Sequence, residues 1–494
     1  MKKKLAELAA LVDGAVISGD SDAVVEDIVN DSREAGAGAM FVCFVGAHVD
    51  GHRFIPEVAA KGVRVVMTEL DIEAPAGVTV LKVPSLDAAL QRIAPFFFDY
   101  PGKRMRLIGI TGTNGKTTTS YLLRDILRRA GFRVGVIGTI RIMIEDEILP
   151  VKNTTPDIIS LQRTLARMYA AGIDYVVMEV SSHALAMERV TGCEFDTAVF
   201  TNLTQDHLDY HKTFENYRLA KAKLFELVSE RGLKAGKSVV VNIDDGSGQT
   251  MLDHAGCRKL TYAVDRPADI QAADIRIKPQ GAEFTLRGGF GEMVLQLKIT
   301  GMFNVYNVMG AVGAALAEKV EPKHIVAALQ DFGGVSGRFE LVSAGQPFAV
   351  IVDYAHTPDG LENILKTARQ ITPKRIITVF GCGGDRDRTK RPIMGRMAAE
   401  LSDVVIETSD NPRTEDPERI LQDVLAGVKE KIGEKPFELI ADRREAIFRA
   451  ISLAGEGDTV VIAGKGHENY QILKDRTIHF DDKEVALEAL GGAR

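Results

Sequence analysis

Short apolar runs alternate with helical stretches along most of this chain, and a glycine-rich turn joins two of them near residue 112. Residues 106–129, RLIGITGTNGKTTTSYLLRDILRR, begin with an apolar run and continue, after the turn, with leucine and isoleucine at helical spacing. This pattern predicts a strand, a turn and a helix that ends at Gly131. A glycine turn between a buried strand and a helix is typical of a loop that binds phosphate with its backbone N–H groups.

The residues of this turn suit a nucleoside triphosphate with Mg²⁺. Lys116 can reach the β- and γ-phosphates, and the hydroxyl of Thr117 can bind the metal ion. The strict Walker pattern requires a glycine where this chain has Ile110, so the motif is the shorter G-T-N-G-K-T. A glycine turn without a ligand is the alternative, and the flanking strand and helix argue against it. The predicted phosphate-binding residues are Gly112, Thr113, Asn114, Gly115, Lys116 and Thr117.

The chain before this loop predicts a small α/β unit, because short apolar runs are separated by glycine turns. The runs are AVISG, MFVCFVG, VRVVMTEL and TVLKVPS. The triplet Asp31-Ser32-Arg33 precedes one of them and is either a solvated turn or part of a site. The segment YPGK at 100–103 is typical of a linker. We therefore predict three domains, at residues 1–98, 99–333 and 334–494.

The pattern after the loop predicts a doubly wound sheet of parallel strands. In NTTPD, Thr155 suits a helix N-cap and Pro156 the first helical turn. The buried run DYVVMEV contains Glu179 near its end, and the next run, DTAVFTNL, is followed by His207. Ligands of open α/β sheets bind at the carboxyl ends of the strands. Glu179 is therefore expected to bind Mg²⁺ rather than to cap a helix, whereas the residues alone leave the role of His207 open.

From Lys259 to Thr300 the apolar period changes to two, which predicts an antiparallel insertion with an architectural role. The helical pattern that follows contains Asn304 and Asn307. These amides can either read the edge of an adenine or cap the helix, and the sequence does not decide between the two roles.

Beyond Gly334, five apolar runs each end in a polar cluster, which predicts parallel strands with helices between them. The third unit is therefore expected to be Rossmann-like in fold. GxGxxG is absent, so dinucleotide binding is not supported. Charged strand ends that gather at one edge of a sheet predict an anionic, highly polar ligand, and a surface on which these charges are scattered is the alternative.

The composition excludes several classes of protein. At 494 residues, 45% hydrophobic and 26% charged, the chain is typical of a globular protein of about three domains. Its net charge of −7 provides no basic surface for nucleic acid. Four widely spaced cysteines fit a reducing cytoplasm without structural zinc, and no apolar run reaches the ~20 residues that a membrane helix needs. We expect a cytoplasmic monomer that does not insert into membranes.

Ten motifs occur in an order that resembles one family of enzymes. They are TGTNGKTTT, NTTPD, MEVSSHAL, TNLTQDHLDYH, YRLAKAKLF, GRFE, DYAHTPDG, FGCGGDRDRTKR, TSDNPRTEDP and AGKGHE. In this order they resemble the ATP-dependent Mur ligases of peptidoglycan synthesis, most closely the UDP-N-acetylmuramoyl-tripeptide synthetases. The resemblance spans nearly the whole chain. The phosphate loop alone would also fit folylpolyglutamate synthetases, which usually lack a hundred-residue domain in front of it.

The resemblance implies a mechanism through an acyl phosphate. A carboxylate of UDP-MurNAc-L-Ala-D-Glu attacks the γ-phosphate of ATP, and the amine of a diamino acid then displaces phosphate to form an amide. By resemblance, Lys116 would contact the phosphates, Thr117 and Glu179 would hold a first Mg²⁺, and His207 would bind a second. The nucleotide side would also include Asn304, Arg338, Asp353 and His356.

The resemblance also assigns the nucleotide-sugar substrate to two domains. The first domain would bind the UDP end, with Ser32 as a contact. The muramoyl peptide would contact Thr154, Thr155, Ser181, Met187 and Arg189, with Met187 standing where some relatives have a glutamine.

Lys221 stands where the family carries a lysine that CO₂ converts to a carbamate. The change reverses the charge from plus one to minus one, and the carbamate can help to bind the second Mg²⁺. From the residues alone, a solvated lysine beside Lys223 is favoured instead.

The same resemblance predicts meso-diaminopimelate as the incoming amino acid. The segment Asp410-Asn411-Pro412-Arg413 matches the branch that adds it, whereas lysine-adding relatives usually lack the arginine. A guanidinium can hold the distal carboxylate with two charge-assisted hydrogen bonds, and lysine would leave it unpaired. Arg386, Gly464 and Glu468 would hold the other end of the amino acid. On local chemistry alone, the segment is instead a proline turn.

Three alternatives to this function stay open at the level of sequence. One is a lysine-adding synthetase, and another is a folylpolyglutamate synthetase-like ligase, which would act without a nucleotide sugar. The third is an ATP-gated binding module that uses the three domains as a clamp and shows no turnover.

Overall fold

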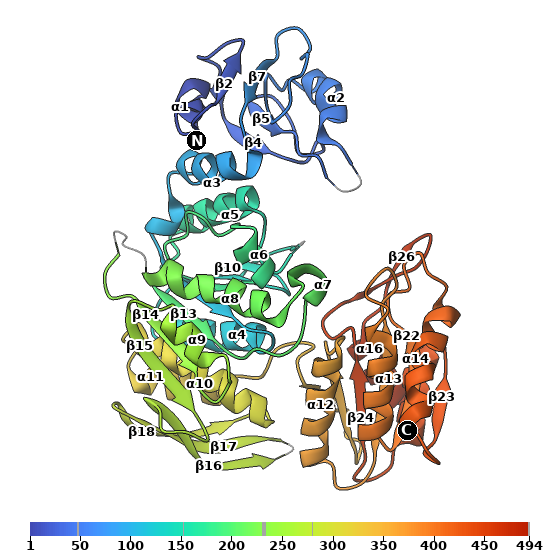
Figure 1. The fold of residues 1–494 in the computed structure, drawn as a ribbon. Helices are drawn as coiled ribbons and strands as arrows, with labels where there is room; N and C mark the ends of the chain where they lie inside the picture. Colours follow the sequence, from blue (N-terminus) through green and yellow to red (C-terminus); the bar gives the residue numbers. More distant parts are fainter. Residues whose placement is uncertain (47–48, 152, 230–233, 279, 493–494) are drawn as a thin grey trace.

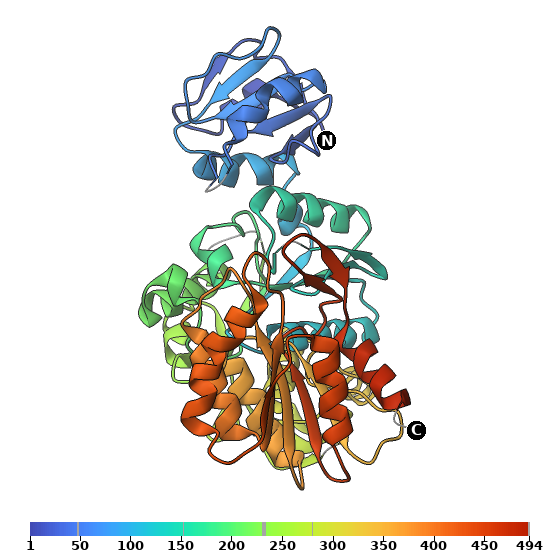
Figure 2. The same cartoon turned by 90° about the vertical axis from the view of Figure 1, so that its right-hand side faces the viewer.

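The computed structural model describes residues 1–46, 49–151, 153–229, 234–278 and 280–492. Its strands form three large sheets, of five, eleven and six strands, which follow one another along the chain. Figures 1 and 2 show the first unit, in blue, at one end of the molecule and the third unit, in orange and red, beside the middle one. The predicted α/β fold in three parts is confirmed, while the exact domain boundaries stay predictions.

The first unit is a small α/β unit, and three of the four strand pairs in its five-stranded sheet are parallel. Its core extends into the middle unit, because Ile159 of helix α5 packs among the apolar residues of the first unit. Helix α3 also packs directly on α5. In sheet order the strands are β2 (Val16–Ser18), β7 (Thr79–Lys82), β6 (Val65–Thr68), β5 (Ala39–Val42) and β4 (Asp27–Val29); β1 (Lys3–Lys4) pairs with β3 (Val24–Val25), and the helices are α1 (Leu5–Ala9), α2 (Ile55–Ala60) and α3 (Leu86–Phe97).

The middle sheet is parallel in its centre and antiparallel at both ends. In sheet order its strands are β11 (Glu147–Leu149), β10 (Ile142–Ile144), β9 (Val134–Ile137), β12 (Tyr175–Glu179), β8 (Arg106–Thr111), β13 (Thr197–Phe200), β14 (Ser238–Asn242), β15 (Arg258–Ala263), β16 (Ile270–Lys278), β17 (Gly281–Gly288) and β18 (Gly291–Leu297). The helices are α4 (Lys116–Arg129), α5 (Ile158–Ala170), α6 (Ser182–Ala186), α7 (Leu208–His211), α8 (Phe214–Ser229), α9 (Gly248–Asp253), α10 (Met302–Ala317) and α11 (Pro322–Asp331).

The antiparallel segment predicted between Lys259 and Thr300 is confirmed for its larger part, since the pairs β16–β17 and β17–β18 are antiparallel. Its first strand differs, because β15 is parallel to both neighbours. The reason is that helix α9 makes the crossover into β15, whereas tight turns join the last three strands. These strands therefore extend the main sheet.

One prediction for this unit is wrong, and it concerns the start of helix α5. Asp157, not Thr155, is the N-cap, and its carboxylate accepts hydrogen bonds from the N–H groups of Ile159 and Ser160, each at 3.1 Å. Thr155 is buried, and its hydroxyl donates to the backbone oxygen of Glu179 at 2.8 Å. Its side chain therefore ties the NTTPD segment to strand β12.

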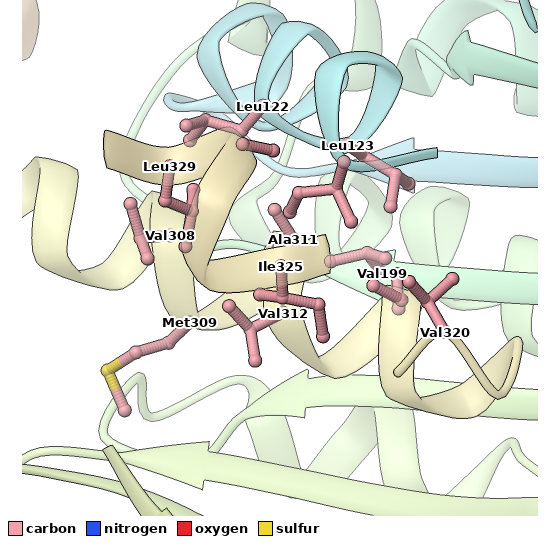
Figure 3. Packing of buried hydrophobic residues seen from close by; sticks show 14 of the residues in the cluster. Leu122, Leu123, Val199, Val308, Met309, Ala311, Val312, Val320, Ile325 and Leu329 are labelled. Carbon is pink, nitrogen blue, oxygen red and sulfur yellow. The ribbon is translucent and has the colours of Figure 1, made fainter. Parts of the chain in front are cut away.

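One apolar core fixes the helix that follows the phosphate loop. Figure 3 shows Leu122 and Leu123 of α4 in the same core as Ala311 and Val312 of α10. Each buried leucine contributes about 1.5–3 kcal/mol of transfer free energy. Helix α10 also lies close to the sheet, since a Cβ on Gly313 would be 2.5 Å from Val240 Cγ1. Helix α4 is thus held rigidly with its first turn at the carboxyl end of β8.

The third unit has the predicted Rossmann-like arrangement, with helices on both faces of a mostly parallel sheet. Because β20, β24, β21, β22 and β23 are parallel, their carboxyl ends share one edge. In sheet order the strands are β19 (Glu340–Leu341), β20 (Ala349–Asp353), β24 (Thr459–Ala463), β21 (Ile376–Cys382), β22 (Val404–Ser409) and β23 (Phe437–Leu439). The other elements are the hairpin β25 (Tyr470–Ile472) and β26 (Thr477–His479), and helices α12 (Pro358–Ile371), α13 (Lys390–Leu401), α14 (Pro417–Lys431), α15 (Arg443–Leu453) and α16 (Asp482–Gly492).

Candidate active site

The phosphate loop follows strand β8 and leads into helix α4, as the sequence predicts. Gly115 has φ of +85°, and a Cβ at this position would lie 2.2 Å from Asn307 Oδ1, so the loop requires glycine there. The ammonium of Lys116 donates to the backbone oxygens of Gly112 and Thr113, each at 2.8 Å. Burial lowers the pKa of Lys116, against the attraction of Glu179. The loop is thus folded around its own lysine.

The carboxylate of Glu179 lies beside the first turn of α4. Thr117 Oγ1 donates to Glu179 Oε2 at 3.0 Å, and the hydroxyl of Thr139 donates to the same oxygen at 3.0 Å. Thr154 Oγ1 is 3.1 Å from Thr139 Oγ1, so Thr139 links the hydroxyl group of Thr154 to the carboxylate of Glu179. Carboxylate and hydroxyl oxygens are ligands that Mg²⁺ prefers. The sequence missed Thr139, whose position after strand β9 was the available signal.

In the part of the chain that the structure describes, no group of three His, Cys, Asp or Glu side chains could hold a metal ion. A cation beside Glu179 would therefore need further oxygens, from Thr117 and from phosphate, which is how Mg²⁺ is usually bound with nucleotides. The oxygen atoms of Glu179 and Thr117 fit Mg²⁺ if phosphate supplies further ligands.

His207 and Lys221 lie near the phosphate loop on the other side. His207 begins helix α7 with φ of +55°, and its Nε2 is 3.4 Å from Asp206 Oδ2. Its ring stacks edge-on with His183, with 4.8 Å between the centroids. Burial, chiefly, lowers the pKa of His207 to about 4. The position of His207 at the rim of the sheet agrees with the prediction, and the carboxylate of Asp206 is the polar partner of its ring.

The amine of Lys221 is buried against the phosphate loop and is not solvated. Its Nζ donates to the backbone oxygen of Gly112 at 2.8 Å and lies 4.6 Å from the centre of the Tyr217 ring. Only 2% of the residue is exposed. Burial, followed by repulsion from Lys116, lowers the pKa of Lys221 well below its usual value. The solvated-lysine interpretation is therefore wrong.

A cavity of about 580 Å³ lies between the middle and third units. Its wall combines the phosphate loop with the carboxyl end of β20 and with aromatic and aliphatic side chains, including Phe303, Tyr306 and Ile364. Asn307 lines it, whereas Asn304 is buried behind it and donates to the Thr300 oxygen at 2.8 Å. The predicted residues that line the cavity are Thr113, Asn114, Gly115, Lys116, Thr117, Thr154, Glu179, His207, Arg338, Asp353 and His356.

Two units meet directly at this cavity. Arg338 Nη2 lies 3.4 Å from Thr117 Oγ1, and its guanidinium stacks 4.7 Å from the ring centre of Tyr354. Asp359, in the first turn of α12, accepts hydrogen bonds from Asn114 Nδ2 at 2.5 Å and from Thr204 Oγ1 at 2.8 Å. The sequence missed Asp359, because a carboxylate in a first helical turn is ordinary.

Asp353 and His356 are held by backbone contacts in the third unit. Asp353 accepts hydrogen bonds from the N–H groups of Phe339 at 2.6 Å and Ala355 at 2.8 Å. Burial raises the pKa of Asp353, and Arg338 opposes the shift. His356 Nδ1 is 2.9 Å from the Tyr354 oxygen, and burial lowers the pKa of this histidine. Both side chains are thus fixed at the cavity wall.

The residues predicted to hold the nucleotide sugar lie in two places. Ser181 caps α6, and its N–H donates to Thr155 Oγ1 at 3.0 Å. Arg189 Nη2 is 3.1 Å from Met187 Sδ, and Met187 is 43% exposed. Ser32 lies in the first unit, where its backbone oxygen accepts a hydrogen bond from Lys61 Nζ at 2.8 Å. Ser181, Met187 and Arg189 therefore lie together in the middle unit, whereas Ser32 lies in the connection between β4 and β5 of the first unit.

At the shared strand edge of the third unit, the structure brings together most residues of the predicted amino-acid site. Asn411 Nδ2 donates to Glu468 Oε2 at 2.9 Å, and a Cβ on Gly464 would lie 2.9 Å from Asp410 Oδ2. Lys465, which the sequence analysis missed although it lies in the AGKGHE motif, is fully buried among them.

Two arginines flank Gly383 at this edge: a Cβ there would lie 2.9 Å from Arg413 Nη1 and 3.8 Å from Arg386 Cγ. Arg413 follows the buried Pro412, has φ of +52° and donates to the Gly384 oxygen at 2.8 Å. Arg386 is exposed, and its Nη1 lies 3.4 Å from the Asp385 oxygen.

The fold and this site define an α/β protein with a phosphate loop that faces a cleft between two domains. Three family models match the chain: the Mur ligase middle domain over residues 110–315, the glutamate ligase domain of Mur ligases over 337–466, and the Mur ligase family catalytic domain over 25–98. The chain belongs to the Mur ligase family, whose members are ATP-dependent ligases.

Relatives align along nearly the whole chain. A UDP-N-acetylmuramoyl-L-alanyl-D-glutamate–2,6-diaminopimelate ligase of Bacillus cereus is 46% identical over 95% of this chain and 94% of its own length. A protein of the same name from Syntrophomonas wolfei is 43% identical over 99% of both chains.

Solved structures agree with this assignment. One diaminopimelate ligase structure of that name is 33% identical, covers 100% of this chain and 99% of its own, and has a TM-score of 0.68. The MurF ligase of Thermotoga maritima, solved in complex with ADP, shares the fold at 16% identity and a TM-score of 0.66, over 94% of this chain and 97% of its own. No helix among the described residues is long and apolar enough to cross a membrane.

Proposed function

We propose that this protein joins meso-2,6-diaminopimelate to UDP-MurNAc-L-Ala-D-Glu and converts ATP to ADP and phosphate in the process. The observation that carries the proposal is the cavity that joins the phosphate loop to the third unit, since a ligase must bring ATP, an acid and an amine together. Full-length relatives named for this reaction supply the identity of the acid and the amine. A location in the cytoplasm and a monomeric state are part of the proposal.

In the first step, a carboxylate oxygen of the muramoyl dipeptide attacks the γ-phosphorus, and the bond to the β,γ-bridging oxygen of ATP breaks. The products are an acyl phosphate and ADP. Lys116 is placed to release its two carbonyl partners and bind the transferring phosphoryl group, which carries negative charge throughout. Arg338, which reaches the phosphate loop from the third unit, is the second cation available there.

In the second step, the neutral amine of diaminopimelate attacks the acyl carbon, and phosphate leaves. The amine loses a proton as the amide forms. The residues of the third-unit edge bind and orient the amino acid, with Arg413 assigned to the distal carboxylate and Glu468 to the other end. We assign Arg386 and Gly464 to that other end as well.

Mg²⁺ fits the oxygen donors Thr117 and Glu179, and a second ion is assigned to His207 together with Lys221 as a carbamate. When bound, the metal ions would neutralise phosphate charge. Burial and the neighbouring ammonium of Lys116 favour the uncharged amine of Lys221, which is the form that reacts with CO₂.

Ser32 is assigned to the UDP end, and Thr154, Thr155, Ser181, Met187 and Arg189 are assigned to the muramoyl peptide. Met187 contributes only a sulfur contact to Arg189 and is exposed, so its role is the weakest of this set.

Folate ligation is the second candidate, and the length of the match argues against it. A solved folylpolyglutamate synthase of Thermotoga maritima covers 76% of this chain at 20% identity, whereas the solved diaminopimelate ligase covers 100% at 33% identity.

Phosphate release tests the proposal, with ATP, Mg²⁺ and UDP-MurNAc-L-Ala-D-Glu supplied together with single amino acids. Diaminopimelate is expected to support turnover. Turnover with glutamate on a folate, without a nucleotide sugar, would favour the second candidate. If no amino acid supports phosphate release, the result would refute the ligase and favour an ATP-gated binding module.

A further inference from the structure

Lys465 is a completely buried lysine at the carboxyl end of strand β24. Its Nζ lies 3.2 Å from Asn411 Oδ1, 3.3 Å from Glu468 Oε2 and 3.8 Å from Asp410 Oδ1. All three partners belong to the edge assigned above to the incoming amino acid. A buried ammonium costs free energy unless neighbouring charges and hydrogen bonds compensate it, so this placement requires both carboxylates.

The hydrogen bonds around Lys465 fix the orientation of the Asn411 amide. The N–H of Ile472 donates to Asn411 Oδ1 at 2.9 Å, and Lys465 donates to the same oxygen. Because both groups only donate, the oxygen of Asn411 must face them, and its NH₂ group must face Glu468. Lysine, amide and carboxylate thus form one closed arrangement.

Lys465, Asp410 and Glu468 together carry a net negative charge, which can bind a cation. Lys465 carries plus one, and Asp410 and Glu468 together carry minus two, so the three groups sum to minus one. The side chain of Glu468 is 15% exposed, whereas that of Lys465 is not exposed at all. The remaining negative charge therefore lies with Glu468, the more exposed of the two carboxylates.

We propose that Lys465 is a positioning residue of the amino-acid site: it holds Asn411 and Glu468 in the orientation that receives the ammonium group of the incoming diamino acid. The inference rests on the function proposed above and assigns a role to a residue that has none in it. The same network extends to Arg413, which is assigned above to the distal carboxylate, since the N–H of Arg413 donates to the Ile472 oxygen at 3.1 Å.

The test compares wild type with Lys465→Met, which keeps the length of the side chain and removes its charge. We expect the KM for diaminopimelate to rise about 10- to 100-fold, as expected for losing hydrogen bonds that involve charged groups. The KM values for ATP and for UDP-MurNAc-L-Ala-D-Glu should change less than about 2-fold, because their sites do not contain this lysine. Lys465→Gln keeps a donor and should give an intermediate KM.

Lys435→Met is the matched control in the same unit. Lys435 donates to the backbone oxygens of Ala399, Glu400 and Ser402, away from the strand edge. This variant should lower the melting temperature without raising the KM for diaminopimelate.

Two results would overturn the inference: an unchanged KM for diaminopimelate in Lys465→Met, or an equal loss for all three substrates, as a merely structural role predicts. If the methionine variant does not fold, the glutamine variant is judged by the same two results. A wild-type protein that releases no phosphate with any amino acid would instead refute the proposed function, and the inference with it.

Discussion

The phosphate loop of the middle unit and the strand edge of the third unit hold their lysines in different ways. Lys116 and Lys221 both donate to the backbone oxygen of Gly112. Lys465 instead contacts the side chains of Asp410, Asn411 and Glu468. Both arrangements give the lysine nitrogens hydrogen-bond acceptors, but the first uses main-chain oxygens and the second uses polar and charged side chains.

Under the proposed function, this difference follows from the ligand that each region recognises. Phosphate is the same in every nucleoside triphosphate, so backbone N–H groups and one lysine, Lys116, can recognise it under the proposed function. An amino acid is distinguished by the positions of its charges, which only side chains of opposite charge can read. Side-chain changes at the strand edge should therefore alter selectivity, whereas changes at the phosphate loop should alter rate.

The largest effect is expected for Arg413→Ala. Without the guanidinium, kcat/KM for diaminopimelate should fall roughly a thousandfold, while kcat/KM for lysine should change little, because lysine has no distal carboxylate to lose. The measurement is phosphate release with both amino acids in wild type and variant.

Arg419→Ala, at an exposed position of the neighbouring helix α14, is the control and should behave as wild type. Wild-type protein that uses lysine as well as diaminopimelate, or a variant that keeps the preference, would show that Arg413 is not the selector.

Lys221→Ala should reduce kcat about 100-fold for every amino acid and leave the ratio between amino acids unchanged, since a metal ligand supports the shared first step. Removal of CO₂ from the buffer should lower the wild-type rate, and bicarbonate should restore it.

Lys223→Ala, two residues further along α8, is the matched control. Full activity of Lys221→Ala, or an intact mass that shows an unmodified amine in active protein, would contradict the carbamate.

Glu407 allows a test of the third unit that does not involve substrate. It lies in β22, is 1% exposed, and neither carboxylate oxygen has a hydrogen-bond partner among the described residues. Burial raises the pKa of Glu407 from 4.5 to about 9. The folded protein thus holds a proton that the unfolded chain releases, so stability should fall as pH rises from 4.5 towards 9.

Between pH 6 and pH 8, this group should remove about 2–3 kcal/mol from the unfolding free energy. Glu407→Met should lack this loss in denaturation followed by circular dichroism, and the exposed Glu434→Gln should retain it. An identical pH slope in wild type and Glu407→Met would show that the carboxyl group is not protonated in the fold.

The sequence predicted those parts of the site that lie at the ends of regular elements. Glu179 and the phosphate loop could be placed together because parallel strands end at one edge, and the structure has Thr117 in contact with Glu179. Lys465 and Asp359 lie inside the motifs AGKGHE and DYAHTPDG but were not singled out, because their importance comes from burial and from contacts between segments far apart in the chain. Thr155 was placed wrongly as a cap because its hydroxyl bonds across to strand β12 instead.

The smallest effect is expected in the shape of the protein. Asp359 joins the third unit to Asn114 and Thr204, and Gly334, with φ of +98°, lies in the connection between the units. Binding of an ATP analogue with the UDP-muramoyl substrate should change this junction and reduce the radius of gyration in solution scattering. Identical scattering curves with and without the two ligands would exclude such a closure.

The central claim is that phosphate-loop chemistry in one unit is coupled to diaminopimelate recognition in another. Phosphate release from the wild-type protein, measured with UDP-MurNAc-L-Ala-D-Glu and a panel of amino acids, tests it most directly. We predict release with diaminopimelate, with kcat/KM roughly a thousandfold above that for lysine. Release that is equal for both amino acids, or absent with diaminopimelate, would contradict the account.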